Sequence, residues 1–419
     1  MLKRLSRSHD FSKGFKNASF LAAGNIISEL ITFVTFTFVA RYFLPQDYGI
    51  YTTVLAYVGM FQILTLGGVN KSVVRRASEK TENIAEILEK GAALRLLFII
   101  LAITVCNIGL FFVNYDIKVK TLILVYSLSI YFHELTRFYY SGYYVINKIK
   151  QISFQTISSR LLFAVFSWLI ILLKGSIELL VLSSLLVSIV FLLITRFSLK
   201  RNSVPIRLLL KPKFYEEFFK SGIIFSVFGA VTMLATKFDV FIISILGNTS
   251  EVAIYGVAFT IAGQAIMLRN VNQDSFFPII VKRLQKGMLS KKLLFQSTLI
   301  MFLIPFLPTC VFFFFSREII TFLFGNNYAD AGPILSFLMI YVSFAWGTLP
   351  FTVLAQSAYK EKVLLKVRIW MAVANVALDF IFFHYFGLIG IAYVSALVWS
   401  FGSVIMCFAI YKNLYPVQK

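Results

Sequence analysis

Residues 178–199, ELLVLSSLLVSIVFLLITRFSL, decide the fold class. No charged residue occurs between Leu179 and Thr195, and the stretch lacks the polar face of an amphipathic surface helix. A helix needs about 20 mainly apolar residues to cross the hydrocarbon core of a bilayer. The stretch is therefore predicted to be a membrane-spanning helix.

Eleven further stretches have the same character, so we expect an all-α polytopic membrane protein with about 12 transmembrane helices. The gaps between them are too short for a soluble domain of any size. The predicted spans are roughly 17–40, 48–69, 91–113, 120–144, 153–173, 178–199, 220–246, 253–277, 293–315, 331–355, 363–383 and 388–411. Residues 77–90, between the second and third spans, fit a short amphipathic helix at the membrane interface or a solvated loop helix.

The composition excludes a soluble enzyme. Of the 419 residues, 59% are hydrophobic and 14% are charged, and the mean hydropathy is +0.82. Soluble domains are about 45–50% apolar and about 25% charged. The chain also lacks a Walker loop, HExxH, GxSxG and any Cys/His metal cluster, which excludes an ATP-driven pump built from this chain alone.

The positive charges predict the orientation. The net charge of +21 comes from 40 Lys and Arg against 19 Asp and Glu. With a cytoplasmic N-terminus, 30 basic residues fall in predicted cytoplasmic segments, 5 on the opposite side and 5 within spans. Both termini are therefore expected on the cytoplasmic side of the membrane. The basic balance is attributed to topology and anionic lipid headgroups, and no nucleic-acid partner is expected.

A weak internal repeat predicts two lobes. At an offset of 204 residues, Tyr51 aligns with Tyr255 and Gly59 aligns with Gly263. Six predicted helices in each half give both halves the same orientation, so we expect two six-helix lobes around a central cavity. The predicted domains are 1–199 (N-terminal lobe, helices 1–6), 200–219 (cytoplasmic linker) and 220–419 (C-terminal lobe, helices 7–12).

Three motifs carry a resemblance to a known family. Residues 40–51, ARYFLPQDYGIY, are similar to a signature of polysaccharide flippases, and residues 319–331, IITFLFGNNYADA, look like their motif before the tenth helix. Asn375 followed by residues 387–392, GLIGIA, resembles the run that joins their last two helices. With twelve predicted spans, the chain resembles the Wzx-type O-antigen and polysaccharide repeat-unit flippases of the multidrug/oligosaccharidyl-lipid/polysaccharide (MOP) exporter superfamily.

The glycines and the proline of these motifs have local physical roles. Pro45 and Gly49 are expected to turn the chain between the first two helices. Gly325 is expected to permit a left-handed helix cap, and Gly387 and Gly390 are expected to let helices approach closely.

The resemblance implies a substrate and partners. The substrate would be an undecaprenyl-pyrophosphate-linked oligosaccharide, moved by alternating access across the inner membrane for O-antigen, lipopolysaccharide or another surface polysaccharide. Membrane lipids, a polysaccharide polymerase and a chain-length regulator would be partners, and the chain would be a transporter and not an enzyme.

Ionisable residues inside the spans are the candidate site residues, because such groups are costly in a bilayer and face a cavity or a partner. Arg and Lys side chains could replace the hydration of a pyrophosphate, or could instead form buried structural pairs. Arg95 lies near the end of its span and is expected to snorkel to the interface. The candidate substrate cavity consists of Arg137, Arg269, Lys237, Arg160, Glu29 and Glu134.

An aromatic run from Phe138 to Tyr144 allows two interpretations. It could stack on sugar rings, or it could belong to the aromatic belt at the membrane interface.

A second set of residues could bind a coupling ion. Asn375 and Asp379 share one helix face, Asp239 lies at a similar predicted depth, and Ser395 follows the Ile391 carbonyl by one turn. Hard oxygen ligands suit a small cation such as Na⁺, and some flippases of the superfamily carry a sodium site between helices 7, 11 and 12. Two alternatives stay open: Lys237 neutralises Asp379, or Asp379 alone carries a proton. No other cofactor or metal is expected.

Two rival functions predict different sequence features. A multidrug exporter of the same superfamily predicts a cavity dominated by acidic residues. A membrane polysaccharide polymerase predicts one large external loop, whereas the longest external gap here is 316–330.

Overall fold

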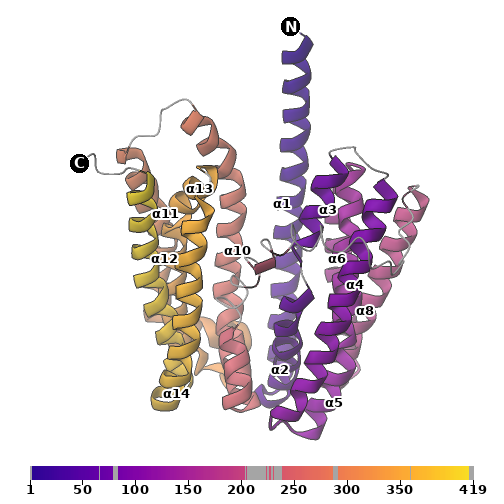
Figure 1. Ribbon diagram of the computed structural model, residues 1–419. Helices are drawn as coiled ribbons and strands as arrows, with labels where there is room; N and C mark the ends of the chain where they lie inside the picture. Colours follow the sequence, from indigo (N-terminus) through magenta and orange to yellow (C-terminus); the bar gives the residue numbers. More distant parts are fainter. Residues whose placement is uncertain are drawn as a thin grey trace. The chain divides into compact units, whose positions relative to one another are not determined.

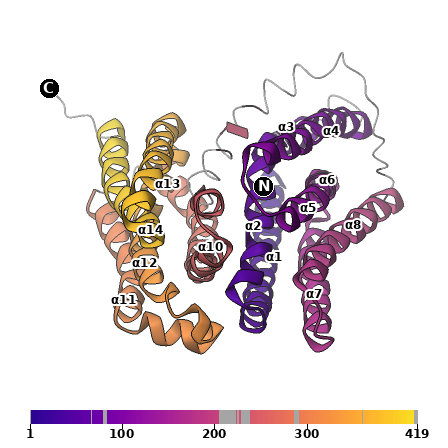
Figure 2. The ribbon, with the colours of Figure 1, turned by 90° about the horizontal axis from the view of Figure 1, so that it is seen from below.

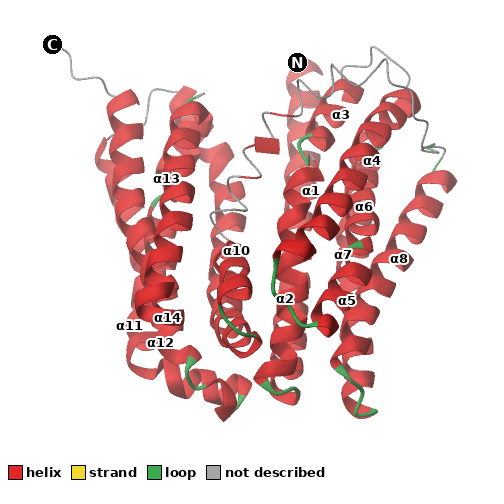
Figure 3. Ribbon diagram, turned by 60° about the horizontal axis from the view of Figure 1, so that its bottom comes forward, coloured by secondary structure: helices red, strands yellow, loops and turns green. Residues whose placement is uncertain are grey.

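The computed structural model describes residues 2–65, 67–78, 84–202, 238–285, 291–358 and 360–414, with isolated positions between 203 and 237. Side chains are described from residue 19 onward, except those of 274–290. Every element in these ranges is a helix (Figure 3), which confirms the predicted all-α fold class.

The longer helices have the length and composition of membrane spans. Among the described residues, eight helices are long and apolar enough to cross a bilayer, or nine if the bent pair Pro45–Thr65 and Val69–Ala77 forms one span. In chain order the helices are α1 (Leu2–Tyr42), α2 (Pro45–Phe61), η1 (Gln62–Thr65), α3 (Val69–Ser78), α4 (Ile84–Gly109), η2 (Leu110–Phe112), α5 (Ile117–Tyr126), α6 (Leu128–Val145), α7 (Ile149–Leu172), α8 (Ile177–Arg201), α10 (Thr249–Gln285), α11 (Lys291–Phe324), η4 (Asn326–Tyr328), α12 (Ala331–Gly347), α13 (Leu349–Ser357) and α14 (Glu361–Leu414). Residues 238–246 are also helical.

The helix α14 consists of two spans. Its 54 residues would measure about 81 Å if straight, against a hydrocarbon core of about 30 Å. Gly387 interrupts it with φ 60° and ψ −145°, values that a side chain disfavours. With this break, the described helices are compatible with about twelve spans; the predicted span 220–246 lies largely outside the described residues. The chain is a multi-pass membrane protein.

Contacts between residues divide the chain into two compact units. Unit 1 contains Met1–Val39 and Val54–Ala230, and unit 2 contains Ala40–Thr53 and Val231–Lys419. In unit 1, α6 packs against α4 and α8, and α8 packs against α7 (Figure 2). In unit 2, α12 packs against α10, α11 and α14 (Figure 1). The linker predicted at 200–219 lies mostly outside the described residues, so the predicted domain limits stay a prediction.

The offset of 204 residues recurs in the helices of the repeat. The helix α2 begins at Pro45, which is suited to the first helical position, and α10 begins at Thr249. A capping box starts α10, because Asn248 and Glu251 exchange hydrogen bonds between side chain and main chain at 2.8 and 3.0 Å. Gly49 is inside α2, and a Cβ there would lie 1.7 Å from the Thr249 carbonyl oxygen. The prediction that Gly49 turns the chain was wrong; it permits this close approach.

The other motif glycines have separate roles. Gly325 follows α11 with φ 95° and ψ 167°, so its φ is positive as predicted, but its ψ lies outside the left-handed helical region of the expected cap. A Cβ on Gly390 would lie 2.3 Å from the Phe382 carbonyl oxygen, so this glycine does allow close approach. A Cβ on Gly387 would meet nothing within 4 Å. Its predicted packing role was therefore wrong, and its role is the backbone conformation at the break.

Two further expectations fail at one end of unit 1. Residues 84–90 form the first turns of α4 and not a separate interfacial helix, and Ile87 and Leu88 are buried there. They belong to a core cluster that also contains Phe138, Tyr139 and Tyr143. These three rings are therefore core residues and not a surface for sugars, whereas Tyr144 of the same run is exposed.

Candidate functional site

Four of the five predicted ion-binding residues meet in unit 2. Asp239 Oδ1 accepts a hydrogen bond from Asn375 Nδ2 at 3.0 Å, and its Oδ2 accepts one from Ser395 Oγ at 2.7 Å. Asn375 Nδ2 also donates to Asp379 Oδ2 at 2.8 Å. All four side chains are buried, and they come from 238–246 and both halves of α14. Ile391, the fifth residue, is buried one turn before Ser395.

Tyr255 completes this network and was not among the predicted site residues. Its Oη donates to Asp239 Oδ2 at 2.6 Å from α10. The alignment of Tyr51 with Tyr255 in the repeat singled the residue out, but nothing in that pattern indicated a carboxylate partner. The hydroxyl adds a second donor to an oxygen that already accepts from Ser395.

Two oxygens of the network have no hydrogen-bond partner among the described residues. They are Asn375 Oδ1 and Asp379 Oδ1, and both are buried. No Lys, Arg or His of the described residues lies within 4 Å of either carboxylate; Lys237, the predicted neutralising partner, lies outside the described residues. Buried carboxylates without a cationic partner are costly unless a proton or a metal ion compensates them. The donor set of carboxylate, amide and hydroxyl oxygens fits a hard cation.

A second polar cluster lies in unit 1 around Glu134 on α6. Its Oε2 is 2.5 Å from Arg95 Nη2, and its Oε1 is 3.0 Å from Arg137 Nη1. Thr65, at the end of η1, donates to Glu134 Oε2 at 3.3 Å and accepts a hydrogen bond from Arg95 through its carbonyl oxygen. One carboxylate therefore serves two guanidinium groups, and the three side chains carry a net charge of +1.

Arg95 does not snorkel, contrary to the prediction. Its side chain is 1% exposed. Since α4 begins at Ile84 and not near 91, Arg95 lies eleven residues, or about 16 Å, inside the helix. Glu134 and the Thr65 carbonyl take the place of water around its guanidinium group.

Arg137 differs from Arg95 in exposure. Its side chain is 63% exposed although it is eight residues, about 12 Å, from the end of α6 at Val145. Arg160 and Glu29, the other cavity candidates of unit 1, are half-buried on α7 and α1. Arg160 Nε is a buried atom without a hydrogen-bond partner.

Arg269 is held by neutral groups of unit 2. Its side chain is buried, Nε donates to the Ala345 carbonyl at 2.7 Å, and Nη2 donates to Thr348 Oγ1 at 3.3 Å. Nη1 donates to the amide oxygens of Asn270 and Gln273. No carboxylate of the described residues lies within 4 Å of the guanidinium group, which ties α10 to the junction of α12 and α13.

Comparisons with known proteins place the chain in a family. Residues 15–284 match the model of a family described as "Polysaccharide biosynthesis protein". The chain belongs to this family. A comparison of the sequence with curated proteins found no significant match.

Several solved structures share the fold of this polysaccharide biosynthesis protein. One is the lipid II flippase MurJ in an inward closed conformation, with a TM-score of 0.73 and 17% identity over 96% of this chain and 87% of that one. Another is a multidrug resistance MATE family transporter of the MOP superfamily in an inward-facing conformation, with a TM-score of 0.70 and 14% identity over 93% and 96% of the two chains. A mutant of the Vibrio cholerae MATE transporter VcmN gives a TM-score of 0.59 and 14% identity over 96% and 98%. The chain thus has the fold of MOP-superfamily flippases and transporters.

Proposed function

We propose that this protein is a flippase that moves an undecaprenyl-pyrophosphate-linked oligosaccharide repeat unit across the bacterial inner membrane. The two units would act as lobes that alternate access to a central cavity, with both termini in the cytoplasm. The product would feed O-antigen or another surface polysaccharide, where a polymerase and a chain-length regulator are the expected partners. Family membership and the MurJ-like fold support this assignment.

The observation that carries the proposal is the exposed guanidinium of Arg137. A charged group so far from a helix end is costly against lipid tails, so it is expected to face an aqueous cavity. Glu134 fixes its position from one side and leaves the remaining donors available. Arginine binds phosphate oxygens bidentately, which suits a pyrophosphate headgroup. The net positive charge of the Arg95–Glu134–Arg137 cluster favours an anion over the cationic drugs of a multidrug exporter.

The network around Asp239 and Asp379 is proposed to couple transport to an ion gradient. A sodium ion would find the two unpartnered oxygens of Asn375 and Asp379 together with Asp239, Ser395 and, as a further proposed ligand, the Ile391 carbonyl. A proton on Asp379 is the alternative. Transport in proteoliposomes with a sodium gradient, a proton gradient or neither separates the two, and Asp239→Asn should abolish the sodium-driven component.

A variant series in proteoliposomes tests the substrate assignment. The probe is a polyprenyl-pyrophosphate oligosaccharide with a fluorescent label, and flipping is measured by reduction of label in the accessible leaflet. Arg137→Ala should lower the rate at least about tenfold, and Arg137→Lys should recover only part of it, since Lys lacks the planar fork. Lys118→Ala, which removes the exposed pair with Glu178, is the matched control and should leave the rate unchanged. Equal rates for Arg137→Ala and Lys118→Ala would contradict the proposal.

A further inference from the structure

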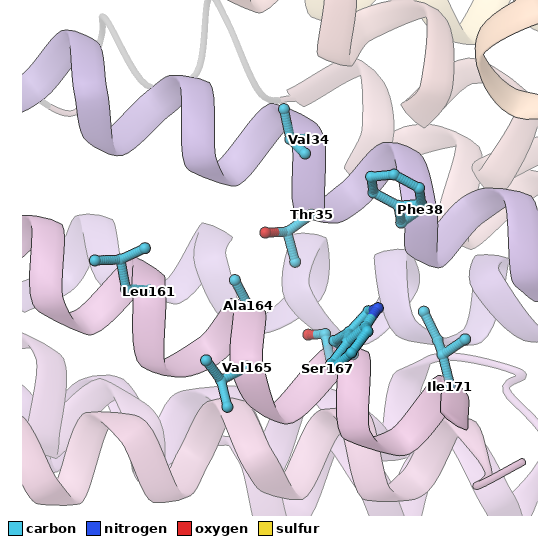
Figure 4. Close-up of a pocket in the computed structure, with 9 residues that line it drawn as sticks. Val34, Thr35, Phe38, Leu161, Ala164, Val165, Ser167 and Ile171 are labelled. Atoms are coloured by element: carbon cyan, nitrogen blue, oxygen red, sulfur yellow. The ribbon is translucent and has the colours of Figure 1, made fainter. Parts of the chain in front are cut away.

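A groove between α1 and α7 lies entirely within unit 1. It has a volume of about 340 Å³, at the lower end of the range for small-molecule pockets, which begins at about 300 Å³. Figure 4 shows Val34, Thr35 and Phe38 on one wall and Leu161, Ala164, Val165, Ser167 and Ile171 on the other. The ninth lining residue is Trp168.

The lining offers a ligand few polar partners, since Trp168, which is exposed, contributes one indole N–H and only two other side chains are polar. Only Thr35 and Ser167 carry side-chain hydroxyls among the nine, and both are buried. Thr35 donates to the Ile31 carbonyl at 2.7 Å, and Ser167 donates to the Phe163 carbonyl at 2.8 Å. Since both hydroxyl donors are already used within their own helices, the groove suits a hydrocarbon.

A charged residue continues the groove toward the middle of the membrane. Arg160, Ala164, Ser167 and Ile171 are spaced by four, three and four residues, so they share one face of α7. Arg160 is the twelfth of the 24 residues of α7, about 16 Å from one end and about 18 Å from the other, and its buried Nε has no hydrogen-bond partner among the described residues. The apolar lining from Leu161 to Ile171 fills the half of α7 beyond it.

We propose that this groove holds the polyprenyl tail of the lipid-linked substrate while the pyrophosphate lies near Arg160. The inference rests on the proposed function and assigns the tail a path within unit 1. The depth of Arg160 distinguishes this occupant from an ordinary phospholipid. Phospholipid headgroups stay at the interface, so only a lipid whose phosphate has entered the membrane interior can pair with Arg160 and fill the groove at once.

Photo-crosslinking in nanodiscs tests the assignment. The probe is a polyprenyl pyrophosphate with a diazirine in its isoprenoid chain, and a phosphatidylglycerol with a diazirine in its acyl chain is the comparison. The polyprenyl probe should label the α7 peptide that contains Leu161 and Ile171. Ala164→Phe fills the groove and should reduce this labelling about tenfold, as should Arg160→Gln, which removes the anchor. Ala23→Phe makes the same substitution at an exposed position of α1 outside the groove and should leave labelling unchanged.

Three outcomes would overturn the tail site. Labelling that is insensitive to Ala164→Phe would do so, as would labelling by the phospholipid that equals the polyprenyl signal. If Arg160→Gln changes the labelling by neither probe, the groove holds ordinary membrane lipid. If Ala164→Phe fails to fold, Val34→Trp narrows the groove from the α1 wall and gives the same readout. Because crosslinking requires no transport, groove labelling without flipping would refute the proposed function and leave the tail site intact.

Discussion

Glu134→Gln should destabilise the protein strongly, because it removes the charge that compensates a buried arginine. The substitution keeps the size of the side chain but leaves Arg95, 1% exposed, without a counter-ion. Removing one partner of a buried ion pair costs about 3–5 kcal/mol. Interhelical polar contacts in membranes are weaker, about 0.6–1.7 kcal/mol. Since Glu134 accepts hydrogen bonds from Arg95, Arg137 and Thr65, we expect a loss of about 3 kcal/mol, near the lower limit for soluble proteins.

Thermal unfolding in detergent measures this loss. The unfolding entropy of about 2.1 cal/mol/K per residue gives about 0.9 kcal/mol/K for the 419 residues, or about 1 °C per kcal/mol, so Glu134→Gln should lower the midpoint by about 3 °C. Glu178→Gln breaks the exposed pair with Lys118 and is the matched control. Exposed pairs contribute about 0.2–1 kcal/mol, so its midpoint should fall by no more than about 1 °C.

A double variant separates the roles of the two arginines. Replacing Arg95 by Met and Glu134 by Leu removes both buried charges and should restore most of the stability. Arg137 then lacks its anchor, so flipping should stay low although the protein is stable. The reasoning fails if Glu134→Gln melts like Glu178→Gln, or if the double variant is as unstable as the single one.

Three further substitutions test local parts of the account. Gly49→Ala should lower the yield of folded protein sharply, because the new Cβ collides with main-chain atoms of Thr249. Gly59→Ala on the same helix places its Cβ in open space and should be tolerated. Expression and gel filtration measure the yield of both variants. Gly387→Ala should cost about 1–3 kcal/mol through its positive φ, while Gly263→Ala in α10 should be neutral or stabilising in a melting experiment. Tyr255→Phe removes one donor to the buried carboxylate and should raise the half-saturating sodium concentration for transport about tenfold, with unchanged turnover at saturating sodium.

The sequence was sufficient for the helices but not for their exact ends. Long apolar runs identify spans whatever their surroundings, as residues 178–199 did for α8. Charged or small residues at a helix end interrupt the apolar run, so the run does not show where the helix begins. Polar residues at 84–90 suggested a separate surface helix, yet they continue into α4, because Ile87 and Leu88 find apolar partners on α6. Because of that error, Arg95 was predicted to lie near the interface, and its pairing with Glu134 was not predicted.

The contact between Asn375 and Asp379 on α14 could be predicted because it depends only on their spacing along the helix. Asn375 and Asp379 share a face at four residues' distance, and they do form a hydrogen bond. The contribution of Tyr255 depends on how α10 packs, which no spacing along the chain encodes. The groove between α1 and α7 was missed for the same reason: its walls are more than 120 residues apart, and each wall alone looks like any lipid-facing helix.

A direct comparison of two cargo classes tests the central claim. Proteoliposomes that contain the purified protein are assayed in parallel with a fluorescent polyprenyl-pyrophosphate oligosaccharide and with a fluorescent cationic drug such as ethidium, under the same ion gradients. We predict gradient-dependent flipping of the lipid-linked oligosaccharide that Arg137→Ala abolishes, and no transport of the cation. Transport of the cation without flipping of the lipid-linked oligosaccharide would contradict the account.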